Sequence, residues 1–231
     1  MFHATIFMTG GTGLIGQWTA ARLTADGEQV LILARQAKER LSAYRDWIDR
    51  HGGRGENVDF IEGDLSKPDL GLDQTDLSVL NKVHKIYHMG ASFSWNLPKG
   101  AARKVNVEGT VSLLALAQKL PCLDRFVLIS GYMVAASERW APFGLEKPSD
   151  LSAMPVTQLQ LDKMYRKLGS YEASKLEADI LTRKICGEKN IPLTIINPAT
   201  VIGSAETGEL DQQQGLGALV QAIWRKMFTA I

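Results

Sequence analysis

The sequence predicts a doubly wound α/β fold, in which helices cover both faces of a parallel sheet. Three observations predict it. Short apolar runs alternate with longer segments of helical periodicity over most of the 231 residues, which is the pattern of consecutive βαβ units. A glycine-rich turn joins the first apolar run to the first helical segment. No internal repeat or low-complexity linker divides the chain, so we expect one domain over residues 1–231.

The first half of the chain supplies four of the expected strands and three helices. Each strand is a short apolar run, and glycines such as Gly52-Gly53 end the helices. On the second helix, Leu41, Tyr44 and Ile48 fall on one face. The expected strands are residues 6–8, 29–34, 58–61 and 85–89, and the expected helices are residues 17–25, 38–50 and 76–82.

The second half adds longer helices, two strands and an irregular segment. The helical pattern of residues 101–120 ends at Pro121, which cannot continue a helix. Residues 138–169 are expected to be irregular, with Ser170 as the cap of a helix that runs to about residue 186. The other expected elements are strands at residues 125–129 and 193–196 and a last helix at residues 215–228. Because such folds usually continue further, we expect a fragment, or a protein that lacks most of a C-terminal substrate-binding part.

The composition is that of a soluble globular protein, with 45% hydrophobic and 22% charged residues. The net charge of +1 gives no reason to expect nucleic acid or an anionic membrane surface as a partner. No segment approaches the ~20 apolar residues that span a bilayer, and the apolar start lacks the basic region of a signal peptide. Cys122 and Cys186 are isolated in apolar surroundings, so we expect buried thiols and a cytoplasmic protein.

A glycine-rich turn follows the first strand. It reads Thr9-Gly10-Gly11-Thr12-Gly13-Leu14-Ile15-Gly16. A strand, a glycine turn and a helix in this order form the dinucleotide-binding turn of Rossmann-type folds, in which Gly11 and Gly13 let the backbone approach a pyrophosphate and Gly16 lets the helix lie close to the strand. The free N–H groups and positive dipole end of the helix attract phosphates. We therefore expect these eight residues to bind a dinucleotide.

The residue after the second strand indicates which nicotinamide cofactor binds. NAD-dependent proteins commonly have Asp or Glu there, which binds the ribose 2′-hydroxyl. Here the position is Arg35, with Lys38 and Arg40 close behind. A guanidinium can bind a 2′-phosphate through two parallel hydrogen bonds, whereas a carboxylate repels it, so we expect NADP(H). Asp64, after the third strand, either accepts a hydrogen bond from the adenine amino group or caps its own turn.

Tyr171 and Lys175 are four residues apart in a helical segment, so they share a face. An ammonium beside a phenol favours the phenolate, and we expect it to lower the tyrosine pKa from ~10 toward the working range. Tyr171 is then a credible general acid for a carbonyl oxygen that receives hydride. No other tyrosine in the chain has a lysine four residues later.

Five short motifs follow one another along the chain. They are Thr9-Gly10-x-x-Gly13-x-x-Gly16, Gly63-Asp64-Leu65, Asn106-Val107-x-Gly109-Thr110, Tyr171-x-x-x-Lys175 and Asn197-Pro198. With this ordered set the chain resembles, over nearly its whole length, the extended short-chain dehydrogenase/reductases. It is most similar to their thioester reductase and fatty acyl-CoA reductase (male-sterility-like) branch. The branch is indicated by Leu33-Ala34-Arg35, by residues 63–72 and by the long spacer before residues 169–175.

The resemblance implies that Lys175 also holds the nicotinamide ribose and that a Ser or Thr after the fifth strand polarises the substrate carbonyl. The sequence departs from the family there, because Gly131 stands at the place of that hydroxyl. Ser130 either replaces it after a small backbone shift or is an ordinary serine at a strand end. Loss of one such donor can cost ~10² in rate. We further expect cofactor contacts from Leu65, Gly90, Ala91, Asn106 and Pro198.

The expected function is reduction of a small-molecule acyl thioester or related carbonyl, free or carrier-bound, by NADPH with Tyr171 as general acid. Residues 138–169 and 203–231 would contribute to the substrate site. His88 is the only histidine expected to face the cofactor, and no metal site is expected. Family analogy alone points to a homodimer through residues 101–120 and 171–186.

Two other functions stay open on the sequence. A nucleotide-sugar epimerase or dehydratase has the same fold, but it usually prefers tightly held NAD, and Arg35 counts against it. A non-catalytic NADP(H)-binding sensor domain would explain Gly131 and the early C-terminus. The presence of both Tyr171 and Lys175 counts against that second alternative.

Overall fold

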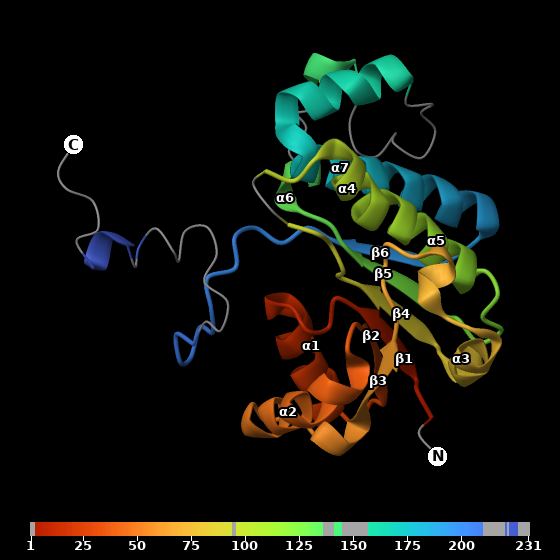
Figure 1. Cartoon of the computed structure of the whole chain (residues 1–231), viewed down its shortest axis with the longest axis vertical. Helices are drawn as coiled ribbons and strands as arrows, with labels where there is room; N and C mark the ends of the chain where they lie inside the picture. The colour runs from red at the N-terminus through yellow and green to blue at the C-terminus, as the bar shows by residue number, and fades with distance from the viewer. Residues whose placement is uncertain are drawn as a thin grey trace.

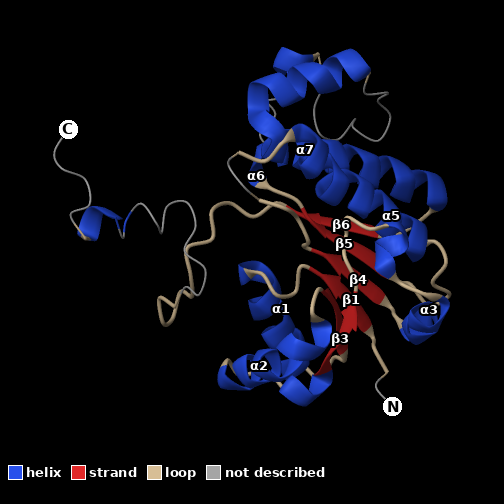
Figure 2. Cartoon of the chain, viewed as in Figure 1, coloured by secondary structure: helices blue, strands red, loops and turns tan. Residues whose placement is uncertain are grey.

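The computed structural model describes residues 3–93, 96–135, 141–144, 157–209, 220 and 222–225. Its centre is a six-stranded sheet with the order β3-β2-β1-β4-β5-β6, in which every neighbouring pair is parallel (Figure 2). The strands are β1 (Ile6–Thr9), β2 (Val30–Ala34), β3 (Val58–Glu62), β4 (Lys85–His88), β5 (Arg125–Ile129) and β6 (Leu193–Ile196). All six strand predictions are confirmed, with ends that differ by at most one residue.

Helices cover both faces of the sheet, so the predicted Rossmann-type α/β fold is confirmed (Figure 1). One face carries α1 (Leu14–Ala25) and α2 (Ala37–Arg50), and the other carries α4 (Lys99–Arg103), α5 (Gly109–Ala117) and α7 (Gln158–Lys189). Shorter helices are α3 (Gln74–Val79) and α6 (Tyr132–Ala135). Single 3₁₀ turns lie at Gly55–Asn57, Pro68–Gly71, Leu80–Lys82 and Ala141–Phe143.

The strands direct alternate side chains into the two helical layers. On β1, Phe7 packs with Leu113 and Leu114 of α5, whereas Ile6 and Met8 pack with the layer of α1 and α2. Both faces of the central strands are therefore buried. This burial explains why β2 is apolar along its whole length and β1 is apolar up to Thr9, without alternating polar residues.

The strand order places a crevice beside β1. Strands β2 and β3 lie on one side of β1, and β4 to β6 lie on the other. Doubly wound sheets bind their ligands at such a reversal, outside the carboxyl ends of the strands. Here those ends are Thr9 of β1 and His88 of β4, which are paired in register. The glycine turn starts at Thr9, and the segment with Gly90 starts just after His88.

Helix α7 begins earlier than the sequence predicted. The irregular structure expected over residues 138–169 is wrong for residues 158–168, because Thr157 caps a helix there and accepts a hydrogen bond from the Gln160 N–H. That part of α7 buries Met164 and Tyr165 in a small apolar cluster with Leu176. Ser170 is not the cap of the whole helix; it follows a break at Gly169, whose φ of 77° and ψ of 169° are not helical. Residues 138–140 and 145–156 lie outside the described residues.

The helix expected over residues 101–120 is also divided. A π-helical turn, η4 (Lys104–Glu108), separates α4 from α5, and α5 ends at Ala117. π-Helical turns are rare, and those that occur often lie at functional sites. This one carries Asn106, a residue of the predicted site.

The remaining predictions have mixed outcomes. Cys186 is buried as expected, but Cys122 is exposed, since it lies in the turn after α5, and both cysteines are free. Most of the expected helix at residues 215–228 lies outside the described residues, although residues 220 and 222–224 are helical. Within the described ranges, no helix combines the length and the apolar character that a membrane crossing requires.

Candidate functional site

The glycine turn has no room for side chains at its closest contacts. A Cβ atom on Gly10, whose φ is +72°, would lie 2.5 Å from the backbone nitrogen of Gly90. A Cβ atom on Gly16 would lie 2.2 Å from the carbonyl oxygen of Gly10. The turn can therefore press the start of α1 against the ends of β1 and β4 only if these positions are glycine.

The start of α1 faces this turn without a side-chain cap. Its N-cap residue is Gly13, which makes no side-chain hydrogen bond to the helix. The first N–H groups of a helix lack intrahelical partners and favour anions. A pyrophosphate fits this position by its charge and by the close backbone approach that the glycines permit.

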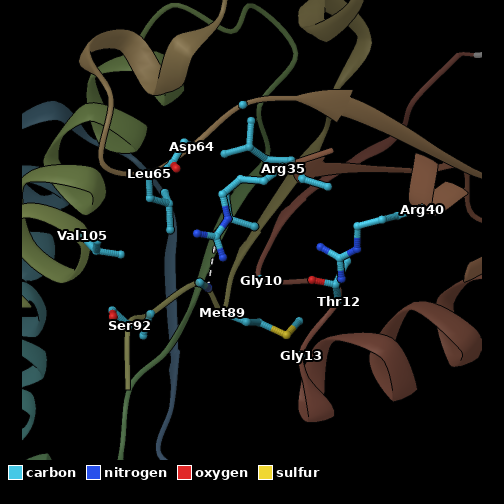
Figure 3. A pocket seen from close by; sticks show the side chains of 16 residues that line it. Gly10, Thr12, Gly13, Arg35, Arg40, Asp64, Leu65, Met89, Ser92 and Val105 are labelled. Atoms are coloured by element: carbon cyan, nitrogen blue, oxygen red, sulfur yellow. Dashed lines mark hydrogen bonds between the residues drawn. The ribbon is translucent and has the colours of Figure 1, made fainter. Parts of the chain in front are cut away.

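A cavity of about 340 Å³ adjoins the turn. Nine of the predicted cofactor residues line it: Thr9, Gly10, Thr12, Gly13, Arg35, Asp64, Leu65, Gly90 and Ala91 (Figure 3). The other seven lining residues are not among the predicted cofactor contacts, although Arg40 supports the predicted preference for NADP(H): Leu33, Ala34, Arg40, Gly63, Met89, Ser92 and Val105. Most of these seven follow or precede a predicted residue at a strand end, and that position was the signal available for them.

The other predicted cofactor residues lie elsewhere. Leu14, Ile15 and Pro198 line a second cavity of about 480 Å³, between α1 and the segment that follows β6. Gly11 and Gly16 contribute to the turn by close packing. The structure thus brings most of the predicted residues to one edge of the sheet, on both sides of the α1 N-terminus.

Two arginines enter the first cavity from different sides. Arg35 follows β2, and Arg40 comes from α2; both side chains point into the cavity in Figure 3. The N-terminus of α2 is already neutralised, because Glu62 accepts hydrogen bonds from the N–H groups of Gln36 (3.1 Å) and Ala37 (2.8 Å). An anion in this part of the cavity would therefore be recognised by the guanidinium groups, not by the helix N-terminus.

Asp64 has one of the two roles that the sequence left open, the cap of its own turn, and it also lies at the cavity. Its carboxylate accepts a hydrogen bond of 2.8 Å from the Ser66 N–H, so it does cap its own turn, and it also lines the cavity. Burial alone would raise the pKa of this carboxyl, but the hydrogen bonds from Ser66 and the charges of Arg35 and Lys67 keep it below the usual value. Asp64 therefore presents an ionised acceptor to the cavity.

Tyr171 and Lys175 lie on the second part of α7, after the break at Gly169. The ring of Tyr171 packs edge-to-face on Phe93, with 4.7 Å between the ring centroids. The side chain of Lys175 is buried, and its Nζ donates a hydrogen bond of 2.8 Å to the carbonyl oxygen of Ile129 at the end of β5. This bond joins the helix of Tyr171 to the strand that ends beside Ser130.

The pKa of Tyr171 does not shift in the predicted direction. Burial, and then the charge of Glu172, raise the pKa of the phenol above 10.0, whereas the sequence predicted a lowered value. Burial lowers the pKa of Lys175 to about 8, and the charge of Asp179 partly opposes this shift. The direction of the Tyr171 shift is therefore set by burial and then by Glu172, while the ammonium of Lys175 donates to a backbone carbonyl.

Ser130 has a buried hydroxyl that lacks a hydrogen-bond partner among the residues that the structure describes. It is 7% exposed and is fixed by its own N–H, which donates to the carbonyl of Ile196. Gly131, the residue at the family position, has no hydroxyl to offer. An unpartnered buried hydroxyl costs stability, so Ser130 is a better candidate for a functional group than an ordinary strand-end serine.

Asn106 and His88 are buried and do not line the first cavity. The expectation that His88 faces the cofactor is wrong, because its ring lies between the hydroxyls of Thr9 and Thr110. Asn106 binds Ser92 and Ser174 through its side chain. In the described part of the chain, no three His, Cys, Asp or Glu side chains gather as a metal site.

Comparison with known proteins gives three findings. The sequence model of the NAD-binding family described as male sterility protein matches residues 8–231. The NRPS-like oxidoreductase fscA of Fusarium equiseti is 26% identical over 230 residues, which are 94% of this chain and 20% of that protein. The nonribosomal peptide synthetase inpA of Emericella nidulans is 25% identical over 238 residues, covering 94% of this chain and 15% of that protein.

Two solved structures are similar in fold. The terminal R domain from the myxalamid PKS-NRPS biosynthetic pathway is 26% identical, with a TM-score of 0.66 over 88% of this chain and 50% of that chain. The yeast methylglyoxal/isovaleraldehyde reductase Gre2, complexed with NADPH, is 18% identical, with a TM-score of 0.67 over 86% of this chain and 58% of that chain. The chain spans about a fifth or less of the curated relatives named above and about half of these solved chains.

Proposed function

Because the chain belongs to the NAD-binding family described as male sterility protein, we propose that it is a reductase domain that uses NADPH to reduce an acyl thioester. The observation that carries the proposal is a set of groups at the carboxyl ends of the strands. There a glycine turn fitted to a pyrophosphate, two arginines, and the pair Tyr171 and Lys175 come together with the unpartnered hydroxyl of Ser130. The first set fits a phosphorylated dinucleotide, and the second set fits carbonyl chemistry.

The residues would hold the cofactor in order along the crevice. The adenosine part fits the cavity of Arg35 and Asp64, and the pyrophosphate fits the turn at Gly13. The resemblance gives the nicotinamide ribose to Lys175. When bound, NADPH supplies a hydride from C4 of its nicotinamide ring.

NADPH is preferred over NADH in this proposal because of the charges around the adenosine part. Arg35 and Arg40 offer two cations to a 2′-phosphate. Glu62 is directed to the N-terminus of α2, where it neutralises the helix and does not bind a ribose hydroxyl. No carboxylate follows β2 at the position of Arg35, where NAD-dependent folds commonly have one.

On the catalytic side, Tyr171 would hold a proton on its phenol oxygen for the substrate oxygen. Its raised pKa keeps the phenol protonated at neutral pH, as a general acid requires. Ser130 would donate a second hydrogen bond to the same oxygen. The reduced thioester is then a hemithioacetal, and cleavage of its C–S bond releases an aldehyde and a thiol.

The thioester class comes from the relatives. The two curated relatives carry nonribosomal peptide synthetase or NRPS-like names, and one solved relative is the terminal R domain of a PKS-NRPS pathway. We therefore propose a carrier-bound acyl group as substrate. Within the expected substrate wall, residues 158–168 form the first part of α7, before the break at Gly169 and the turn that carries Tyr171.

The test is NADPH oxidation, followed by absorbance, with acyl-thioester, aldehyde and ketone substrates. We expect turnover with the thioester, and we expect Tyr171→Phe to lower kcat by about 10²–10³ while NADPH still binds. Full turnover by Tyr171→Phe would refute the mechanism. Cofactor that stays bound through purification, with no dependence on added NADPH, would favour an epimerase or dehydratase. NADPH binding without turnover of any substrate would favour a sensor domain.

A further inference from the structure

His88 is a buried histidine that the proposed reaction does not use. It ends β4, is 2% exposed, and is bound on both sides of its ring. Its Nδ1 lies 2.6 Å from the hydroxyl oxygen of Thr9, and its Nε2 lies 2.7 Å from the hydroxyl oxygen of Thr110. Both threonines are buried, with 0% and 1% exposure. The ring thus connects the end of β1, from which the glycine turn follows, to α5.

The protons in this connection can be ordered in only one way. The hydroxyl of Thr110 donates to the carbonyl of Asn106 at 2.7 Å, so its oxygen must accept the proton of His88 Nε2. At the other end, the oxygen of Thr9 accepts the N–H of Gly90 at 3.3 Å. The hydroxyl proton of Thr9 is then donated to Nδ1 of His88. Every donor and acceptor is satisfied only by a neutral imidazole with its proton on Nε2.

The far end of the connection is the π-helical turn that carries Asn106. The side-chain oxygen of Asn106 accepts the N–H of Ser92 at 2.7 Å, and its amide donates to the hydroxyl of Ser174 at 2.9 Å. Ser174 in turn donates to the carbonyl of Tyr171 at 2.8 Å. Asn106 therefore joins the loop that lines the cofactor cavity to the first turn after Tyr171.

We propose that His88 is a positioning residue: as a neutral Nε2–H imidazole, it joins the glycine turn to Asn106 and so fixes the distance between the cofactor cavity and the helix of Tyr171 and Lys175. Its link to catalysis rests on the proposed function, whereas its link to the cavity does not. Histidine suits this place because its rigid ring offers one donor and one acceptor. The hydroxyl of Thr110 donates to Asn106 and so accepts from the ring, whereas the hydroxyl of Thr9 accepts from Gly90 and donates to the ring.

The surroundings of the ring keep it neutral. Burial first, and then the charge of Lys175 from α7, lower the pKa of His88 to about 3. Among the described residues, the hydrogen-bonding and aromatic partners of the ring are uncharged: the two threonine hydroxyls and the ring of Phe126, whose centroid lies 6.2 Å away. Protonation would place an N–H against Thr9 in place of the acceptor Nδ1, so the hydroxyl proton of Thr9 would lose its partner. Burial, the charge of Lys175 and the hydrogen bonds all favour the neutral form of the ring.

The test combines nuclear magnetic resonance with matched variants. In the wild-type chain, ¹⁵N shifts should show His88 as the Nε2–H tautomer, without titration between pH 5 and 9. Thr110→Val keeps the shape of the side chain but removes the hydroxyl. We expect it to shift the amide signal of Ser92 and to weaken NADPH binding by about tenfold, since one buried connection is lost. His88→Phe should have a similar effect, and the double variant should be no worse than the more severe single variant.

Thr182→Val is the matched control. Thr182 is also fully buried, and its hydroxyl also donates to the carbonyl four residues earlier, at 2.8 Å, but it does not contact a histidine. It should lose stability like Thr110→Val and leave the Ser92 amide signal and NADPH affinity unchanged. The proposal is overturned by an Nδ1–H or charged His88, or by a Thr110→Val protein that matches Thr182→Val in the Ser92 signal. Failure of wild-type protein to bind NADPH would instead refute the proposed function, and the NMR signals would still decide the role of His88.

Discussion

The two sides of the proposed site are built in different ways. The adenosine side is the glycine turn with the cavity of Arg35 and Asp64, and the catalytic side is Tyr171, Lys175 and Ser130. On the adenosine side, the glycine turn leaves so little space that a single methyl group at Gly16 would lie 2.2 Å from another backbone atom. On the catalytic side, Lys175 takes its partner, the carbonyl of Ile129, from a distant element, whereas the hydroxyl of Ser130 has no hydrogen-bond partner in the described structure. The first side is fixed by backbone geometry, and the second by tertiary packing.

This difference predicts which substitutions abolish binding and folding together and which lower only turnover. Changes to the turn should damage folding and binding together, because the same backbone atoms serve both. Changes to the catalytic side chains should separate turnover from binding. The predictions below test that separation, beginning with the largest effect.

Gly16→Ala should have the largest effect on the adenosine side. Its Cβ would meet the carbonyl of Gly10 and the Cα of Gly11 at 2.2 and 2.6 Å, and neither backbone atom can move alone. We expect a loss of stability of about 2–3 kcal/mol and NADPH binding that is about 100-fold weaker. Thermal unfolding and fluorescence titration with NADPH measure the two effects.

Gly187→Ala is the matched control for that change. Gly187 also lies in a helix, α7, but nothing lies within 4 Å of the Cβ it would gain. Alanine there should stabilise the protein by about 0.5–1 kcal/mol and leave NADPH affinity as it is. Equal behaviour of the two variants would contradict the view that the turn is fixed by its backbone contacts.

Ser130→Ala should separate turnover from folding on the catalytic side. If its hydroxyl donates to the substrate oxygen, kcat/KM should fall by about 10², while NADPH affinity stays the same. Removal of a buried hydroxyl without a partner should leave stability unchanged or raise it. A variant that is slow but at least as stable would identify a functional hydroxyl, whereas unchanged kcat/KM would make Ser130 an ordinary strand-end serine.

Arg35→Ala tests the charge of the adenosine side without disturbing the turn. A charge-assisted contact to the 2′-phosphate is lost, so NADPH affinity should fall by about 20-fold. NADH lacks this phosphate, and its affinity should stay within about twofold. Lys38→Ala is the control, since Lys38 is exposed and does not line the cavity. Wild-type protein that binds NADH as tightly as NADPH would contradict the proposed preference.

The two sides also differ in how far the sequence predicts them. The glycine turn, Arg35 and the six strands could be predicted because their signals are local: a motif, a position after a strand, and an apolar run between turns. The resemblance to the thioester reductase branch, which depends on ordered motifs, is confirmed by the family match over residues 8–231.

The features that the sequence did not predict depend on contacts between distant elements. The start of α7 was missed because prolines dominate residues 142–155, while the helix from Gln158 is stabilised by a buried cluster. The π-turn at Asn106 has no periodic signal of its own. The direction of the Tyr171 pKa shift was wrong because the sequence shows that Lys175 shares its face, but not that burial of the phenol raises its pKa.

The smallest predicted effect also concerns Lys175, through its response to pH. Burial lowers the pKa of Lys175 to about 8, and the charge of Asp179 opposes this shift. Lys175 is therefore almost fully protonated below pH 7 and loses its charge as the pH rises through 8. Because kcat/KM reports the free enzyme, it should fall by about tenfold between pH 7 and 9. The pKa of Tyr171 lies above its usual value, so the phenol does not titrate in this window. Lys175→Arg keeps its charge at pH 9 and should lack this decline; a decline at the same pH in both proteins would show that Lys175 is not the titrating group.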